Sequence, residues 1–412
     1  MRILLLVLLL AAGAARAQPG VVAGRVHQPP DDPADGIPGF MALSGSLTSL
    51  LQLDRLGRTP AGPPATHLGS ESALYARLWL PQGLAVTGFF RLEPAPRTDP
   101  GNRILTDHTG WVDALYARWS LGTVSLFGGK IHPRFGIAWA NAPGLYGNDI
   151  ASDYELREKL GAGVRLWLSD LAGGGAFGQH SLQAEVFTSD TSALSSGILA
   201  RRFATPVTVT DPATGERTTV YRRRFGGSHA VGGADNVDGM GGVVVSLAGV
   251  HVPLPGPLGE LGYTLAWSSR RPGRDAAAAG RSRAEAGIAA GLFHSLPLGP
   301  DLQLLTLVDA VRHWDSGGFR AADAAWLTVS TTLQAGPFTA SLTSLHRRRD
   351  DPGSLRPVTL AEQVVSLSAD LGEVAGIPPL AGLTLAVDWR RIGEAGHLVQ
   401  GLGAGVIWST RF

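Results

Sequence analysis

The sequence predicts an all-β protein, a transmembrane antiparallel β-barrel of about sixteen strands with short turns at one end and long loops at the other. Three observations predict it: strands with one apolar face, turns that alternate between short and long, and an amino-terminal export signal. At 401–412 every second residue from Leu402 is apolar or threonine, and the residues between them begin with three glycines. The apolar side of such a strand faces either a second sheet of a soluble sandwich or lipid. Only a closed sheet satisfies every backbone N–H and C=O group in hydrocarbon.

Composition narrows the class before any motif is considered. The 412 residues include 55 glycines and 27 prolines, no cysteine and 17% charged residues. The chain is too apolar for disorder, and its glycines follow no collagen period. The net charge of +1 argues against a strongly basic nucleic-acid binder, so we expect no nucleic acid among the partners.

The amino terminus has the layout of a secretory signal. Arg2 precedes an apolar run at 3–10, and Ala15-Arg16-Ala17 has the A-x-A form of a cleavage site. The run is shorter than the roughly 20 residues that a spanning helix needs. We therefore expect a signal peptide at 1–17, a periplasmic lead-in at 18–39 and a transmembrane barrel at 40–412.

The lengths of the connections alternate along the rest of the chain. Tight turns such as Pro81-Gln82-Gly83 precede longer polar connections such as 94–110. A soluble sandwich should show turns without this asymmetry. The expected strands are 40–54, 70–80, 84–92, 111–121, 123–131, 160–168, 181–188, 240–252, 261–269, 286–296, 302–312, 325–335, 338–346, 363–371, 383–391 and 401–412. The longest connection, 189–238, contains a further expected hairpin with strands at 206–210 and 218–222.

The closing strand, the export signal and the alternating pattern resemble the outer-membrane β-barrel porins of Gram-negative bacteria. Val406, Trp408 and Phe412 carry the local part of this resemblance, because many of these proteins end in an alternating strand with a terminal phenylalanine. The resemblance implies a passive diffusion channel for small hydrophilic solutes in the bacterial outer membrane. It also implies contact with outer-membrane lipids and lipopolysaccharide, and assembly into a homotrimer.

Charged residues within the expected strands indicate which face lines the lumen. A basic side chain on the lipid face near the bilayer midplane costs roughly 2–4 kcal/mol, so these charges should point inward. The expected channel-lining residues are Arg77, Arg118, Arg165, Glu185, Asp388 and Arg390. About sixteen strands leave an aqueous lumen, and inward arginines favour anions. An ion pair within the wall, without a role in transport, is the alternative for each arginine.

The third outer loop, 132–158, mixes apolar residues with both charges. In general porins the third loop folds into the barrel and narrows it, and the resemblance implies the same here. The expected constriction residues are Lys130, Arg134, Asp149, Asp153, Glu155, Arg157, Glu158 and Lys159. The segment 129–136 also resembles a Gly-Lys…Pro…Phe-Gly segment of some phosphate-selective or siderophore-related porins. An ordinary solvated loop is the alternative.

Arginine clusters recur in the expected outer loops, and guanidinium groups pair bidentately with phosphate or carboxylate. We favour contact with lipopolysaccharide phosphates over recruitment of anionic solutes. The clusters are Arg201-Arg202, Arg222-Arg223-Arg224, Arg270-Arg271 with Arg274, and Arg347-Arg348-Arg349. Tryptophan is favoured at both membrane borders, and the expected girdle residues are Trp111, Trp119, Trp267, Trp389 and Trp408.

Two other functions remain open. A barrel with a blocked lumen would have a structural or adhesive role, and bulky inward residues such as Trp79 and Phe187 are compatible with it. A barrel enzyme is less favoured, because the histidines are scattered and the chain has neither a G-x-S-x-G nor an H-E-x-x-H motif. We therefore expect no enzyme, no cofactor and no metal site.

Overall fold

The computed structural model describes residues 41–57, 64–94, 103–105, 108–157, 159–171, 175–190, 192, 194, 204–210, 217–223, 239–272, 283–350, 357–394 and 397–412. The expected signal peptide at 1–17 and the lead-in at 18–39 lie outside these ranges. Within these ranges, no helix has both the length and the apolar character needed to cross a membrane.

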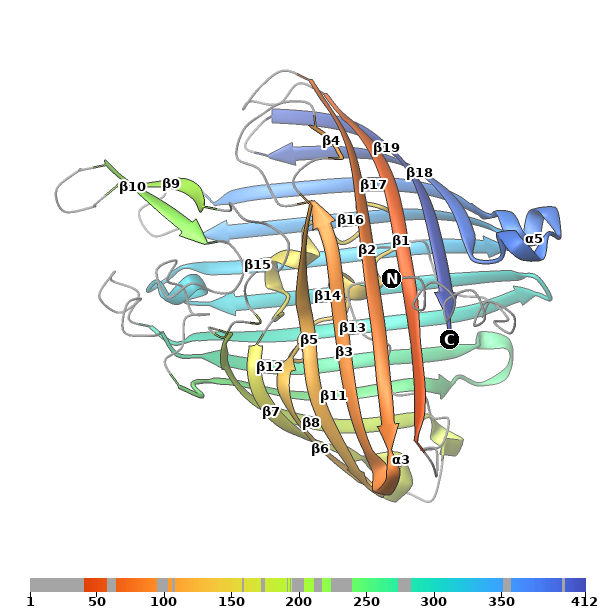
Figure 1. Ribbon diagram of the computed structural model, residues 1–412, viewed down its shortest axis with the longest axis horizontal. Coiled ribbons are helices and arrows are strands. Elements are labelled where there is room, and N and C mark those ends of the chain that lie inside the picture. The colour runs from red at the N-terminus through yellow and green to blue at the C-terminus, as the bar shows by residue number, and fades with distance from the viewer. Residues whose placement is uncertain are drawn as a thin grey trace, which may run out of the picture.

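The main sheet closes on itself into a barrel (Figure 1). β1 (Ala42–Leu56) pairs with β2 (Ala65–Leu80) on one side and with the last strand, β19 (His397–Arg411), on the other. The sheet has 17 strands among the described residues, and one of them, the two-residue β4 (Arg103–Ile104), adds to β2 in parallel; the other sixteen form an antiparallel wall. This closed antiparallel wall confirms the predicted fold class.

The remaining elements follow in chain order. The other wall strands are β3 (Leu84–Pro94), β5 (His108–Leu121), β6 (Val124–Ile131), β7 (Lys159–Trp167), β8 (Gln179–Ser189), β11 (Gly242–Pro253), β12 (Glu260–Arg270), β13 (Glu285–Gly299), β14 (Leu302–Trp314), β15 (Asp323–Ala335), β16 (Phe338–Asp350), β17 (Val358–Asp370) and β18 (Leu383–Glu394). Short helical turns join some of them: η1 (Pro81–Gly83), α3 (Leu168–Leu171), η3 (Gly175–Phe177), η6 (Gly256–Leu258), η7 (Ser316–Gly318), α5 (Leu371–Ala375) and η8 (Pro378–Leu380).

Each expected strand overlaps one strand of the wall, but several strands are longer than expected. β16 continues through Arg347, Arg348 and Arg349, which the sequence placed in an outer loop, because these residues still pair with β15. Backbone pairing therefore continues beyond the apolar stretch, where charged side chains reach water. The expected hairpin in the longest loop is β9 (Ala204–Thr210) paired with β10 (Arg217–Arg223), and it projects from the barrel (Figure 1).

The two faces of the wall have opposite chemistry, as β15 illustrates. Its outward residues Leu327 and Val329 are 41% and 37% exposed, whereas Thr328 and Ser330 between them are almost fully buried. An apolar outside with a polar inside is the reverse of a soluble protein. The outer belt is therefore a lipid-facing surface, and the hydroxyl and charged groups line the interior.

One of the five expected girdle tryptophans does not face outward. Trp119, Trp267, Trp389 and Trp408 are exposed, but Trp111 is buried, so that expectation was wrong for Trp111. The reason is a β-bulge in the pairing of β3 with β5. Phe89 pairs with Ala114 and Phe90 with Val112, so Asp113 is an extra residue. The extra residue reverses which side chains of β5 point inward and which point outward before the bulge, so Trp111 points inward.

We expect Val329→Arg to lower the free energy of unfolding by roughly 2–4 kcal/mol, because it places a guanidinium group near the middle of the apolar belt. Ala335→Arg, at the end of the same strand and on the same exposed face, is the control and should cost roughly 0–1 kcal/mol. Reversible urea unfolding in lipid vesicles measures both values. Equal costs for the two variants would contradict the lipid-facing assignment.

Candidate functional site

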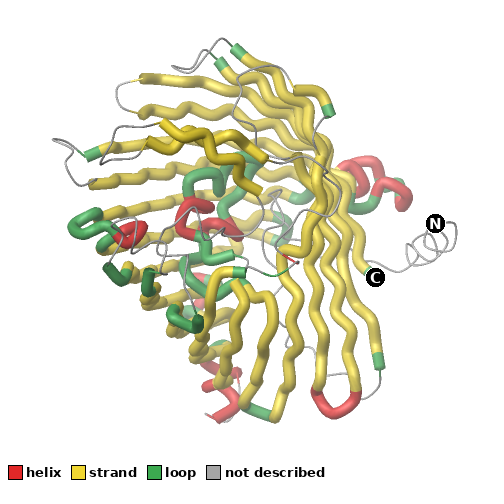
Figure 2. The backbone as a smooth tube through the Cα atoms, turned by 60° about the vertical axis from the view of Figure 1, so that its left-hand side comes forward, coloured by secondary structure: helices red, strands yellow, loops and turns green. Residues whose placement is uncertain are grey.

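The connection between β6 and β7 folds into the barrel and not over its mouth. This segment, 132–158 and here named L3, contains the short helices α2 (Ala138–Asn141) and η2 (Ala151–Tyr154); Glu158 lies outside the described residues. Figure 2 shows helical and loop segments inside the ring of strands. Phe135, Leu145 and Tyr154 of L3 are at most 1% exposed and form one apolar cluster with inward residues of the wall.

Asp309 on β14 binds both ends of L3. Its Oδ2 accepts hydrogen bonds from the backbone N–H groups of Ile137 and Ala138, both at 2.8 Å, and from the Tyr154 hydroxyl at 2.6 Å. Hydrogen bonds to an ionised acceptor are stronger than neutral ones. One wall carboxylate therefore fixes two turns of the loop to the same point.

Two of the expected channel-lining residues also hold L3 by its backbone. Asp388 on β18 accepts from the N–H of Leu145 at 2.6 Å, and Glu185 on β8 accepts from the N–H of Arg134 at 2.9 Å. L3 is thus attached to three well-separated strands by carboxylates that point into the lumen.

Inward glycines of the wall make room for L3. A Cβ at Gly403 on β19 would overlap the Tyr146 ring, and one at Gly405 would press on Leu145. On β13, a Cβ at Gly287 would overlap the Phe135 ring. The glycine face of the last strand, which the sequence pattern did not assign to the core, is therefore a docking surface for the loop.

Ion pairs add to these contacts around the middle of L3. Asp149 lies 2.8 Å from Arg390 on β18, and Asp153 lies 2.6 Å from Arg347 on β16. The Tyr146 hydroxyl donates to Asp54 on β1. Burial, reinforced by the Asp54 carboxylate, raises the pKa of Tyr146 well above its ordinary value, so the phenol stays a neutral donor.

His132 marks the start of L3. Its Nε2 lies 3.0 Å from the backbone oxygen of Asp113, and its Nδ1 lies 3.9 Å from Glu155, which also pairs with Arg157 at 3.2 Å. Burial lowers the pKa of His132, and the Asp113 carboxylate only partly opposes this effect. The imidazole is therefore neutral at neutral pH, and its Nε2 attaches the start of L3 to β5.

The expected arginines Arg77, Arg118 and Arg165 lie together on another part of the wall. They are 3%, 7% and 5% exposed and lie close to the short-turn ends of β2, β5 and β7. Each guanidinium lies near an aromatic ring of its own strand. The distance from the guanidinium carbon to the ring centroid is between 5.3 and 5.9 Å, and the rings are those of Trp79, Tyr116 and Trp167. The apolar cluster of this wall is separate from the cluster around L3.

The structure does not bring all the expected constriction residues together. Lys130 lies on β6 and pairs with Asp190 at 3.1 Å, and its ammonium group donates to the backbone oxygen of Leu194. Lys159 lies at the start of β7. Asp149, Asp153, Glu155 and Arg157 belong to L3, and Arg134 meets Glu185 through its backbone.

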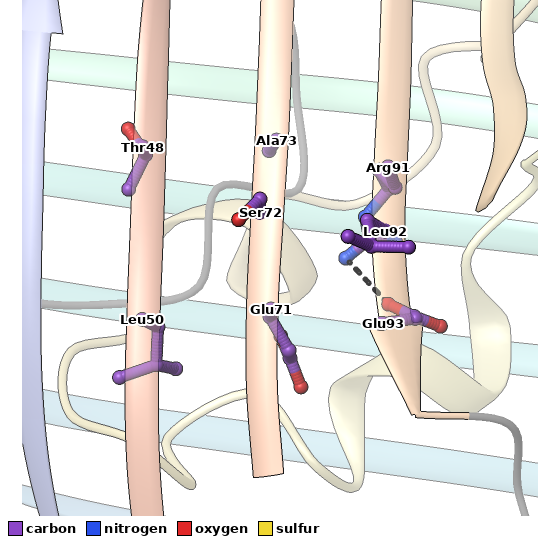
Figure 3. A pocket seen from close by; sticks show the side chains of 8 residues that line it. All are labelled: Thr48, Leu50, Glu71, Ser72, Ala73, Arg91, Leu92 and Glu93. Carbon is purple, nitrogen blue, oxygen red and sulfur yellow. Dashed lines mark ion pairs between the residues drawn. The ribbon is translucent and has the colours of Figure 1, made fainter. Parts of the chain in front are cut away.

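A small cavity lies on the wall formed by β1, β2 and β3 (Figure 3). Its volume is ≈ 20 Å³, which is room for about one water molecule. Glu71 and Glu93 line it together with Arg91, which lies 3.5 Å from Glu93 (Figure 3). Arg91 also lies 3.7 Å from Asp113 on β5. The opposite charges offset one another, so we assign no ligand to this cavity. No group of three or more His, Cys, Asp or Glu side chains in the described ranges is arranged to hold a metal ion.

Sequence reasoning missed Asp309, Asp54 and Glu362 as functional positions. Asp309 carried a usable signal, because it is the one acidic residue in the strand sequence LQLLTLVDAVRHW. The rule that placed Asp388 inward applies to it equally. The role of Asp309 in fixing L3 could not be predicted from the strand sequence, because its hydrogen-bond partners are 155 to 172 residues away in the chain.

We expect Asp309→Ala to release the first turn of L3, because it leaves two backbone N–H groups unsatisfied, at about 1–3 kcal/mol for each buried donor. Hydrogen exchange at the amides of Ile137 and Ala138 measures the effect, which should be a strong loss of protection. Tyr154→Phe removes a single bond to the same carboxylate and should preserve most of the protection. Unchanged protection in Asp309→Ala would refute the anchoring role.

We expect His132 to contribute to acid destabilisation. The unfolded chain protonates this residue as the pH falls through about 6.5, while the buried imidazole of the folded protein stays neutral. The unfolded state then binds more protons, so stability falls as the pH falls in this window. In His132→Gln, the loss of unfolding free energy between about pH 7.5 and about pH 5 should be smaller. His251→Gln, at an exposed site near the end of β11, is the control and should keep the wild-type pH profile.

Comparisons with known proteins give structural likeness alone. No model of a known protein family matches the sequence, and no curated protein matches it. OccAB4 of Acinetobacter baumannii is 10% identical, with a TM-score of 0.49 over 90% of this chain and 98% of that one. The anion-selective porin from Comamonas acidovorans is 10% identical, with a TM-score of 0.49 over 90% and 99%. Pseudomonas aeruginosa OccK2 in complex with glucuronate is 13% identical, with a TM-score of 0.47 over 90% and 98%. At these identities and TM-scores we draw no conclusion about function from the similarity. The assignment of a barrel is based on the strand pairing of this chain.

Proposed function

We propose that the protein is a porin of the bacterial outer membrane, a passive diffusion channel for small hydrophilic solutes. The observation that carries this proposal is a closed wall with an apolar outer belt and an inner face of hydroxyl and charged groups. A polar interior is costly to enclose unless it holds water, and a water-filled barrel conducts small solutes. We propose no enzymatic activity.

The passage lies between L3 and the wall formed by β2, β3, β5 and β7. Two features support this route. L3 is anchored to β1, β8, β14, β16 and β18, whereas on this wall its described anchor is His132 at Asp113 of β5, away from the short-turn end. The apolar cluster of β2, β3 and β5 is separate from the cluster around L3. Arg77, Arg118 and Arg165 are nearly fully buried in this wall, so they act on a passing solute through their positive field, which favours anions.

A barrel with a blocked lumen is the second candidate. The number of strands that L3 contacts favours it, because a loop attached across the interior can also close it. A structural role then replaces transport. A homotrimer and lipopolysaccharide contact through the outer arginine clusters stay predictions from the sequence. Two cluster residues do not fit that contact, because Arg270 is buried against Glu285 and Arg347 pairs with Asp153 of L3.

Conductance in a planar lipid bilayer separates the two candidates. A porin gives stable ohmic steps, and a KCl gradient gives a reversal potential whose sign reports ion selectivity. Correctly folded, heat-modifiable protein that gives no steps would overturn the porin and leave the blocked barrel. Cation selectivity of the wild-type protein would refute the proposed preference for anions but not the porin function.

We expect replacement of Arg77, Arg118 and Arg165 by glutamine to shift the reversal potential toward cation selectivity, since three positive charges leave the lumen wall. Arg312→Gln removes an exposed arginine on the outer face of β14 that pairs with Asp323, and it should leave the reversal potential unchanged. Equal shifts of the reversal potential in the triple variant and in Arg312→Gln would show that the effect is not specific to the lumen.

A further inference from the structure

Arg390 occupies the point where the middle of L3 meets the wall. Its guanidinium carbon lies 4.0 Å from the centroid of the Tyr146 ring, within the range of a cation–π contact. Its Nη1 lies 2.8 Å from Asp149 of L3 and 3.7 Å from Glu362 on β17. The side chain is 12% exposed, so these partners largely enclose it.

Two carboxylates flank this guanidinium, and a third lies nearby on its own strand; β19 contributes only Gly401 beside the arginine side chain. Asp149 comes from L3, Glu362 from β17 and Asp388 from β18 itself, two residues before Arg390 and on the same face. Asp54 on β1 is linked to this group indirectly, because it accepts a hydrogen bond from the hydroxyl of Tyr146, whose ring contacts Arg390. Asp149 and Glu362 both approach the same Nη1 atom, so they lie close to each other. Arg390 therefore links L3 to β17 and β18 by offsetting the unfavourable approach of these two acidic side chains.

The contacts leave little of Arg390 for a solute. Asp149 takes one edge of the guanidinium and the Tyr146 ring takes its face. The same segment of L3 is bound a second time through the N–H of Leu145 and the carboxylate of Asp388. Loss of the positive charge would remove the ion pair of Asp149 and leave the backbone bonds to Asp388 to hold this part of L3 on β18.

We propose that Arg390 is a positioning residue that holds the middle of L3, residues 144–149, against the wall and thereby sets the open cross-section of the lumen. The consequence for the cross-section rests on the proposed porin function; the docking of L3 does not. Arg390 acts through the loop and not by binding the solute.

Arg390→Gln tests the docking without any transport. Hydrogen exchange at the Leu145 amide is the readout, expressed as a protection factor. The variant should lose protection at this amide, because the ion pair between Arg390 and Asp149 is gone and Asp149 is left without its cation partner. Combining Arg390→Gln with Asp149→Asn should restore protection. Arg390→Lys keeps the charge and should retain most of the protection.

Unitary conductance gives the second readout. Arg390→Gln should conduct more than wild type, and the added Asp149→Asn change should bring the conductance back toward wild type, while Arg312→Gln should match wild type. Wild-type protection of the Leu145 amide in Arg390→Gln, or a loss that Asp149→Asn does not reverse, would overturn the positioning role. Absence of conductance in every variant, with the expected exchange pattern, would overturn the porin and leave the positioning role standing.

Discussion

The wall depends on one constraint: backbone N–H and C=O groups within hydrocarbon must bond to each other, because water is absent there. The pairing of β1 with β19 meets this constraint by removing both edges of the sheet. At this seam Gly45 and Phe412 exchange both backbone hydrogen bonds, at 2.9 and 3.0 Å. The Phe412 ring fills the space that a side chain at position 45 would need. A small residue and an aromatic one thus complete the seam together.

Closure has a consequence for every inward residue, because the lumen must then be filled by water, side chains or a loop. L3 brings backbone amides to Asp309 and Asp388, two carboxylates that point into the lumen. The wall in turn offers Gly403 and Gly287, where the loop approaches too closely for a side chain. Wall and loop are complementary in charge and in volume, which explains why apolar L3 residues such as Leu145 are fully buried inside a polar barrel.

The features that the sequence predicted are local, and those it did not predict depend on partners distant in the chain. Alternation and turn length are visible in a single segment, so the strands and their inward charges could be predicted. Trp111 was misplaced because the bulge at Asp113 exists only in the pairing with β3. The role of Asp309 required its contact with Ile137, 172 residues away. Strand ends differed where pairing continues into polar sequence, as at Arg347 on β16.

Inward arginines of a barrel therefore have two roles that burial does not separate, since Arg77 and Arg390 are both largely buried. The location of their contacts does separate them. Arg77 contacts Tyr75 and Trp79 on its own strand and Thr87 on the next, all of which stay in place if the loop moves. Arg390 contacts Tyr146 and Asp149, which belong to the loop. An arginine whose contacts lie on the wall keeps its position if L3 moves, whereas an arginine whose contacts lie on L3 ties the loop to the wall.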